Sequence, residues 1–338
     1  MGMTSQSTQH TASGEGQLDR VLSIEIARVT EAAAIACARL TGRGDEKAAD
    51  KAAVDAMRAE LAKLPISGTV VIGEGEMDEA PMLYIGEALG SGAGPEVDIA
   101  VDPLEGTTIC AKSMPNALAV LAISERGGML HAPDMYMDKI AIGPGYPDGT
   151  VDLDATPTEN ILALAKAKGV PVAEIRACVL DRARHASIIS EIREAGAGVQ
   201  LIPDGDIAGV IWTTDPEKSG IDIYLGSGGA PEGVLAAAAL RCIGGQMQGR
   251  LKPSNDEERQ RAQSMGIGDI TRKFDLTEMA SGDCIFSATG VTSGSLLDGV
   301  HFRQGVAETE TIVLRAATGT VRRIKTTFRM IGKMRRDL

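Results

Sequence analysis

One hexapeptide constrains this chain more than any other feature. It reads Asp-Pro-Leu-Glu-Gly-Thr at residues 102–107 and follows the apolar run 97–101, which predicts a buried strand. The carboxylates of Asp102 and Glu105 are expected just past the end of that strand. Pro103 fixes φ and removes a backbone donor, Gly106 permits a close approach of the backbone, and Thr107 adds a hydroxyl. A divalent cation and a phosphate ester need such groups, so this strand end is a candidate site for both.

A second acidic turn, GEGEMDE at residues 73–79, follows the strand-like run 69–72. Mg²⁺ and Mn²⁺ take oxygen ligands and usually leave coordination positions for water and for a substrate phosphate. The alternative is that acidic turns are simply solvated, which is the better interpretation of an isolated Asp-Gly turn. The proline, glycine and threonine around Asp102 and Glu105 favour a metal site instead. The sequence therefore predicts metal-assisted hydrolysis.

Composition excludes several other classes of protein. The chain has 338 residues, 43% of them hydrophobic, which suffices for one large fold or two coupled subdomains. A formal net charge of -12 and an aromatic content of 3% argue against nucleic acids and anionic membranes as partners. No apolar run reaches the ~20 residues of a membrane span. The five cysteines show no CxxC spacing, which favours buried thiols in a reducing cytoplasm.

Helices and strands alternate along the chain, which predicts the α/β class. Helices are expected over residues 18–41, 45–64 (capped by Asp45), 81–89, 158–168 and 186–195, and a further helix is expected to follow the glycine-rich segment 226–233 and to run through residue 240. Strands are expected over 69–72, 97–101, 117–124, the region of Met129, 175–180, 199–202 and 221–224, with a hairpin over 309–315 and 320–329.

The segment PGYPDG at residues 144–149 is the clearest break in this pattern and predicts a subdomain boundary. We expect a flexible tail over residues 1–17, a metal-binding subdomain over 18–145, and a substrate-binding subdomain over 146–338 that completes the same fold.

Two glycine-containing turns are further candidate sites. Segment 228–233 precedes a helix, where bare amides and the helix dipole favour an anion, although Glu232 could simply offset that dipole. The turn 204–206 (Asp-Gly-Asp) could bind sugar hydroxyls or a metal, or it could be a plain turn. Both remain open on the residues alone.

A basic segment follows the strand expected over residues 175–180. Arg182 and Arg184 could clamp a phosphate through bidentate hydrogen bonds, or they could be ordinary surface charges. His185 beside them has no evident partner, and core packing is the simplest interpretation of Tyr136.

The hexapeptide resembles the signature of the lithium-sensitive, Mg²⁺-dependent sugar and inositol phosphatases. The wider sequence is similar to the bacterial class II fructose-1,6-bisphosphatases, whose motifs occur here in family order over about residues 18–330. These motifs are GRGD at 42–45, VIGEGE at 71–76, DEAPMLYIGE at 78–87, APDMYM at 132–137, IPDGD at 202–206, GGAPEG at 228–233 and IFSATG at 285–290. Arg182-Ala183-Arg184 stands where some relatives have Lys-Pro-Arg. The two positive charges are the same in both tripeptides.

The resemblance implies a layered α-β-α-β-α sandwich and hydrolysis of the 1-phosphate of fructose 1,6-bisphosphate, as in gluconeogenesis. It also implies two Mn²⁺ or Mg²⁺ ions and a homodimer or homotetramer. One ion's implied ligands are Asp50 and Glu74, and the other's are Asp102, Glu105 and Glu232. The implied substrate contacts are Glu105, Gly106, Thr107, Tyr136, Arg182, Ala183, Arg184, Asp204, Gly205, Asp206 and Gly229.

Three residues are expected to act in catalysis. Thr107 would orient the attacking water or help to remove its proton, Asp50 would be its carboxylate partner, and Asp78 would support the metal shell. Alternatives are an enzyme of this fold that also accepts sedoheptulose 1,7-bisphosphate or prefers an inositol phosphate, and a non-catalytic metal-dependent sugar-phosphate binder. A structural calcium-binding protein is the weakest alternative because no EF-hand spacing occurs.

Overall fold

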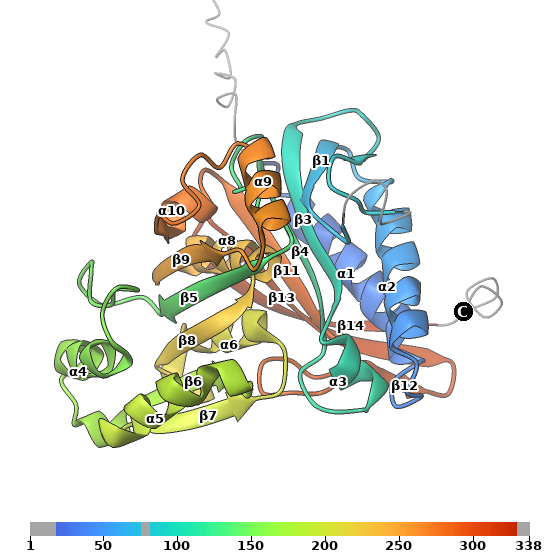
Figure 1. Cartoon of the computed structure of the whole chain (residues 1–338). Coiled ribbons are helices and arrows are strands. Elements are labelled where there is room, and N and C mark those ends of the chain that lie inside the picture. Colours follow the sequence, from blue (N-terminus) through green and yellow to red (C-terminus); the bar gives the residue numbers. More distant parts are fainter. Residues whose placement is uncertain (1–17, 76–81, 330–338) are drawn as a thin grey trace, which may run out of the picture.

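Two β-sheets form the frame of the molecule (Figure 1). The computed structural model describes residues 18–75 and 82–329. The first sheet contains β1 (Ser67–Ile72), β2 (Ala88–Leu89), β3 (Glu96–Glu105), β4 (Leu118–Glu125), β11 (Cys284–Gly290), β12 (His301–Arg303), β13 (Val306–Arg315) and β14 (Thr320–Arg329). Their order is β12-β13-β11-β4-β3-β1-β2, with β14 also paired to β13. Only β1 and β3 among these pairs are parallel.

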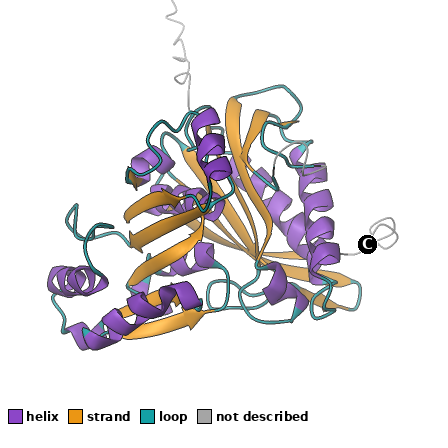
Figure 2. Ribbon diagram, in the orientation of Figure 1, coloured by secondary structure: helices purple, strands orange, loops and turns teal. Residues whose placement is uncertain are grey.

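The second sheet contains β5 (Tyr136–Ile142), β6 (Arg176–Leu180), β7 (Gly198–Ile202), β8 (Ile223–Gly229), β9 (Gln246–Lys252) and β10 (Phe274–Asp275). Their order is β10-β9-β5-β8-β6-β7, and β6 runs parallel to both of its neighbours. The structure is therefore a mixed α/β fold, as predicted (Figure 2).

The helices are α1 (Leu22–Ala38), α2 (Glu46–Leu61), α3 (Thr107–Ala111), α4 (Pro157–Lys168), α5 (Ala186–Glu194), α6 (Asp206–Trp212), α7 (Pro216–Ser219), α8 (Ala230–Ile243), α9 (Asp256–Ser264) and α10 (Leu276–Met279). α1 packs on the first sheet and on α2, whereas α8 contacts strands of both sheets. α4 and α5 pack on the face of the second sheet that points away from α8 (Figure 1).

Local sequence explains the best-defined helices. In α1 the buried residues Leu22, Ile26, Val29 and Ala33 recur at helical spacing and face the core. α2 begins where Asp45 accepts a hydrogen bond from the backbone N–H of Ala48, which confirms the predicted cap. The helices predicted over residues 158–168 and 186–195 and the hairpin over 309–329 are also confirmed.

The helix predicted over residues 81–89 is wrong for the described residues 82–89. Glu87 and Gly86 exchange backbone hydrogen bonds with Val70 of β1, so this segment pairs at a sheet edge rather than coiling. Gly86 has a φ of 94°, which no right-handed helix contains. The strand predicted near Met129 is a single isolated bridge to Ala280, and the true strand there is β5. Residue 81, Asp78 and the tail 1–17 lie outside the described residues.

Two strands are longer than predicted, and both extensions carry candidate site residues. β3 continues past Val101 through Glu105, and β8 continues from Tyr224 through the glycine run to Gly229. In each case cross-strand pairing, to β4 or to β5, extends the strand over residues of low intrinsic strand preference.

The predicted boundary at residues 144–149 stays a prediction. The first sheet takes strands from residues 67–125 and again from 284–329, and the second takes the strands between them, beginning with β5. All five cysteines are buried and free, as the lack of CxxC spacing indicated. Between residues 18 and 329, leaving aside 76–81, no helix has the length and apolarity that a membrane crossing requires.

Candidate active site

A bulge in β3 brings the two carboxylates of the hexapeptide to one side of the strand. Asp102 is paired with Val120 and Glu105 with Leu118, so Pro103 and Leu104 together lie opposite one residue of β4. Side chains three positions apart point to opposite faces of a regular strand. Because Pro103 lacks an N–H and the bulge adds a residue, Asp102 and Glu105 face the same space.

The helix α3 starts directly after this bulge. Gly106 takes the left-handed conformation, with φ 83°, and Thr107 is the first residue of the helix. An L side chain is strained at that φ, which is why the turn from strand to helix needs glycine there. Thr107 therefore follows Glu105 by two residues and lines the same cavity as the acidic cluster.

Glu74 and Asp50 approach the same space from other elements. Glu74 lies two residues past the end of β1, and its backbone N–H donates to the carbonyl of Leu83 at 3.0 Å. Asp50 lies on α2, where periodicity alone suggested a solvated face. Both residues line the cavity that also contains Asp102 and Glu105.

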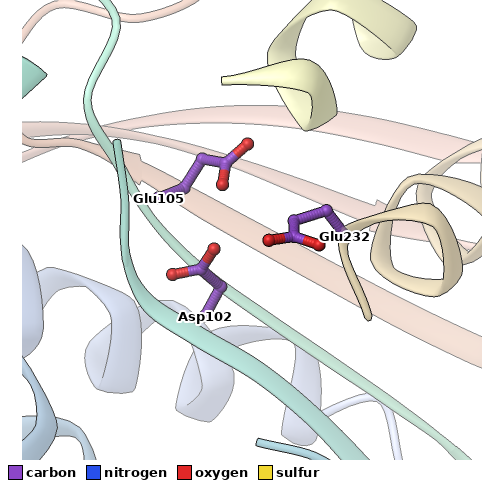
Figure 3. A group of neighbouring side chains, drawn as sticks. All are labelled: Asp102, Glu105 and Glu232. Carbon is purple, nitrogen blue, oxygen red and sulfur yellow. The ribbon is translucent and has the colours of Figure 1, made fainter. Parts of the chain in front are cut away.

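Glu232 comes from the first turn of α8, after the Gly229 N-cap. Its carboxylate folds back over the cap, since a Cβ at position 229 would lie 1.8 Å from Glu232 Oε2. A side chain at position 229 would therefore force the Glu232 carboxylate to move. One ligand-type oxygen from each of Asp102, Glu105 and Glu232 lies within 4.8 Å of the others, and the three side chains point toward one another (Figure 3).

A cavity of about 310 Å³ holds these groups. Its lining includes many of the predicted residues: Asp50, Glu74, Asp102, Glu105, Gly106, Thr107, Asp204 and Glu232. Burial raises the pKa of Glu74 to about 8, and the charges of Asp102, Asp50 and Glu232 add to that rise. Burial is also the main cause that raises the pKa of Glu232 to about 7 and that of Asp102 to about 6.

The donor set fits a divalent cation. Glu232 Oε2 is buried and finds no hydrogen-bond partner among the described residues, which is costly for a carboxylate oxygen. Burial, together with the neighbouring charge of Asp102, raises the pKa of Glu105 well above its usual range. A cation would remove both penalties, and an all-oxygen set suits Mg²⁺ or Mn²⁺.

A second group of predicted residues lies beside the acidic cavity and contains two positively charged side chains, Arg182 and Arg184. The guanidinium of Arg184 stacks on the Tyr136 ring at 4.7 Å and donates through Nε and Nη2 to the Ser227 carbonyl at 3.1 and 2.8 Å. Arg182 Nη2 lies 3.8 Å from Asp204 Oδ1. Tyr136 is exposed rather than packed in the core, so the simplest interpretation of it was wrong.

The remaining predicted residues hold the backbone of this second group. Ala183 opens the short 3-10 turn that contains Arg184, and Gly205 caps α6 in the left-handed conformation, with φ 84°. Asp206 is the first residue of α6 and is buried. Gly229 pairs with Tyr136 across β8 and β5, which joins the two groups.

Comparison with known proteins identifies the family. The model of bacterial fructose-1,6-bisphosphatase, glpX-encoded, matches residues 20–328 of this chain. The chain belongs to this bisphosphatase family. It is 47% identical over 321 residues to fructose-1,6-bisphosphatase 1 class 2 of Escherichia coli (strain K12), covering 90% of this chain and 94% of that relative. Identity and coverage are the same for fructose-1,6-bisphosphatase class 2 of Shigella flexneri. The resemblance found in the motifs is confirmed.

In this bisphosphatase family member, the sequence did not predict the partners of His185 or any role for Lys139. His185 Nδ1 donates to the Leu180 carbonyl at 2.7 Å, and its Nε2 accepts from the Ser227 N–H at 2.8 Å. Since a carbonyl can only accept, Nδ1 carries the proton and the ring is neutral. Lys139 is buried in β5 and pairs with Asp206. Ser227 is 42 positions from His185 and Asp206 is 67 positions from Lys139, so no local sequence pattern could predict either contact.

Proposed function

We propose that this protein hydrolyses the 1-phosphate of fructose 1,6-bisphosphate to fructose 6-phosphate and inorganic phosphate, the hydrolytic step of gluconeogenesis. The observation that carries this proposal is the joint lining of one cavity by the carboxylates Asp102, Glu105 and Glu232 and by Thr107. The names of the class 2 relatives support the same reaction.

We propose two divalent cations, Mn²⁺ or Mg²⁺, as cofactors. Asp50 and Glu74 would hold one, and Asp102, Glu105 and Glu232 the other. When bound, such cations offset phosphate charge and lower the pKa of a nearby water. Glu232 Oε2 has no hydrogen-bond partner among the described residues, and the pKa of Glu74 is raised. Both observations support this assignment, because both carboxylates are buried among like charges.

The roles of the other cavity residues follow from their positions. Thr107 would orient the attacking water through Oγ or help to remove its proton, with Asp50 as the carboxylate partner. Both side chains line the cavity, which supports this pairing. Asp78 remains a predicted second-layer residue outside the described part of the chain.

The sugar and the distal phosphate would lie along the second group. Arg182 and Arg184 would hold the 6-phosphate, and Asp204 and Asp206 would bind sugar hydroxyls. The backbone of 105–107, Tyr136, the turn 182–184, Gly205 and Gly229 would complete the substrate contacts. The position of both arginines beside the acidic cavity, one of them stacked on Tyr136, supports a substrate with two phosphates.

We further propose that the two sheets and their helices form the α-β-α-β-α sandwich of the sugar phosphatases, and that the protein assembles as a homodimer or homotetramer. The position of α8 between strands of both sheets supports the layering. Five free buried cysteines support action in a reducing cytoplasm.

The test is phosphate release from fructose 1,6-bisphosphate, sedoheptulose 1,7-bisphosphate and inositol 1-phosphate, with and without Mn²⁺ or Mg²⁺. Metal-dependent turnover that prefers fructose 1,6-bisphosphate is expected. Equal turnover of both ketose bisphosphates would establish a dual enzyme. No turnover in folded protein that still binds Mn²⁺ would favour the non-catalytic binder.

A matched pair of variants on α2 tests the cavity itself. Asp50→Asn should abolish turnover because Asp50 lines the cavity. Asp55→Asn should leave it unchanged, because Asp55 is exposed and pairs with Lys51 at 3.0 Å on the same helix. Equal losses in both variants would mean that the substitutions act on α2 rather than on the site.

A further inference from the structure

A buried ammonium group, that of Lys139, lies between the starts of α6 and α8. Lys139 is 1% exposed and projects from the face of β5 that also carries the buried Met137 and Ala141. A lysine that is removed from water in this way is costly unless it is paired and hydrogen-bonded. The groups that bind the ammonium of Lys139 must therefore offset the cost of its burial.

Two groups bind it. Lys139 Nζ donates to Asp206 Oδ2 in a short ion pair and to the Gly229 carbonyl at 2.7 Å. Asp206 is the first residue of α6, and Gly229 is the N-cap of α8. The ammonium group of one β5 residue therefore fixes the spacing between the starts of α6 and α8.

The surrounding chain leaves space for this lysine. A Cβ at position 228 would lie 3.0 Å from Lys139 Nζ and 2.2 Å from Asp206 Oδ2. A Cβ at position 233 would lie 3.2 Å from Lys139 Cδ. Neither glycine has a positive φ. A side chain at position 228 would meet Asp206 and Lys139, and one at position 233 would meet Met137 Sδ first, at 2.8 Å, and then Lys139.

Asp206 depends on this contact for its orientation. Among the described residues, its other side-chain partner is the Tyr224 hydroxyl, which donates to the same Oδ2 atom at the longer distance of 3.4 Å. Both interactions engage one oxygen, and within residues 18–75 and 82–329 no hydrogen bond engages Oδ1, on a carboxylate whose direction Lys139 sets. A hydroxyl of a bound sugar is a ligand that such a fixed acceptor would select.

We propose that Lys139 is a positioning residue for the sugar part of the substrate: it holds Asp206 and the Gly229 turn in the geometry that binds sugar hydroxyls. This inference rests on the proposed function, because it needs the phosphatase reaction as its readout. The competing explanation is that Lys139 only offsets the negative charge of the nearby carboxylates. The two explanations differ in what they predict for metal binding.

The experiment compares Lys139→Met with the wild-type enzyme. Methionine keeps the length and apolar stem and removes the charge and the donors. A misplacement of ~1 Å can cost ~100-fold, so KM for fructose 1,6-bisphosphate should rise by about tenfold or more, with a smaller change in kcat. Inhibition by fructose 6-phosphate should weaken in parallel, whereas inhibition by inorganic phosphate and the Kd of Mn²⁺ should change little.

Lys168→Met is the matched control. Lys168 Nζ donates to the buried Asp222 at 2.6 Å, in a lysine–aspartate pair that lies outside the cavity lining and in which the lysine side chain is 31% exposed. That variant should lose stability without a change in KM. If Lys139→Met does not fold, Lys139→Gln replaces it, since glutamine can still donate to the Gly229 carbonyl and needs no buried charge.

A double variant separates positioning from general damage. If Lys139 acts through Asp206, Lys139→Met combined with Asp206→Asn should raise KM no further than the more severe single variant does. Tighter Mn²⁺ binding with an unchanged KM in Lys139→Met would overturn the proposal in favour of charge balance. A wild-type enzyme without activity on any sugar bisphosphate would instead reject the proposed function, and the effect on Mn²⁺ binding would still be measured separately.

Discussion

The Glu105 carboxylate accepts a hydrogen bond from the backbone N–H of Ile207 at 3.2 Å, which joins the end of β3 to the first turn of α6. One predicted metal ligand thus also anchors the helix that begins with Asp206. Glu105→Gln keeps an oxygen for Ile207 and removes the charge, so Mn²⁺ affinity should fall strongly while the metal-free fold is retained. Glu105→Ala should also lose about 1 kcal/mol of stability with the hydrogen bond.

Titration calorimetry with Mn²⁺ and thermal unfolding without metal would check the two parts separately. An unchanged Mn²⁺ affinity in both variants would remove Glu105 from the ligand set.

The metal-free protein should lose stability as pH rises. The pKa of Glu74 is about 8 in the folded state, against a usual value of 4.5, with burial as the main cause. The folded state therefore binds more protons than the unfolded state between these values, and its free energy of unfolding falls as pH increases through them. Mn²⁺ should reverse the trend because it binds the deprotonated carboxylates.

Urea unfolding of chelator-treated protein across that pH range would measure this effect. Glu74→Gln should flatten the slope. A free energy of unfolding that rises with pH in the metal-free wild type, and does not respond to Glu74→Gln, would contradict the prediction.

Thr107→Ala should lower kcat by ~10²–10⁴-fold, the usual contribution of a group that orients or deprotonates a nucleophile. Thr107 lines the cavity at the start of α3. Thr108→Ala is the control, since Thr108 is the next residue of that helix and does not line the cavity. Steady-state kinetics and the melting temperature of both variants are the measurements, and near-normal kcat in Thr107→Ala would sink its role.

Arg184→Ala should raise KM for fructose 1,6-bisphosphate by ~10–100-fold, as expected for the loss of a charge-assisted bond to phosphate. The same variant should leave KM for fructose 1-phosphate nearly unchanged, because that substrate has no distal phosphate. Loss of the stacking on Tyr136 would affect both substrates equally. Comparing the two KM ratios therefore isolates the 6-phosphate contact, and equal ratios would remove Arg184 from it.

His185 should make stability fall at acidic pH. Burial lowers its pKa below the usual 6.5, so protonation favours the unfolded state, and the stability present above 6.5 is lost as pH falls through the folded-state pKa. A protonated Nε2 could not accept the Ser227 N–H. His185→Gln should cost ~1–3 kcal/mol at neutral pH and should shrink this acid-dependent loss, which pH-dependent urea unfolding of both proteins would show.

The linear pattern was sufficient for features that depend on neighbours in the chain. The cap at Asp45, the helices over residues 158–168 and 186–195 and the terminal hairpin were predicted because caps, helical periodicity and turns are local. The hexapeptide was also recognisable for this reason, since Pro103 and Gly106 act within a few residues of the carboxylates they position.

The sequence failed where pairing decided the outcome. Residues 82–89 have a helix-compatible composition, yet backbone bonds to Val70 place them at a sheet edge. The glycine run before α8 was expected as a loop, but pairing with β5 extends β8 to Gly229. Cross-strand hydrogen bonds outweigh weak local preferences, and no local pattern reports where a partner strand will lie.

The sequence by itself determined the family, the α/β class and the oxygen-rich ligand types, because motifs and periodicity are written along the chain. Only the tertiary structure decided that the β3 bulge turns Asp102 and Glu105 to one side, and that Lys139 reaches Asp206 across 67 positions. Charges and carboxylates act through distance in space, and burial sets their energies. Both quantities exist only once the two sheets and α8 have packed.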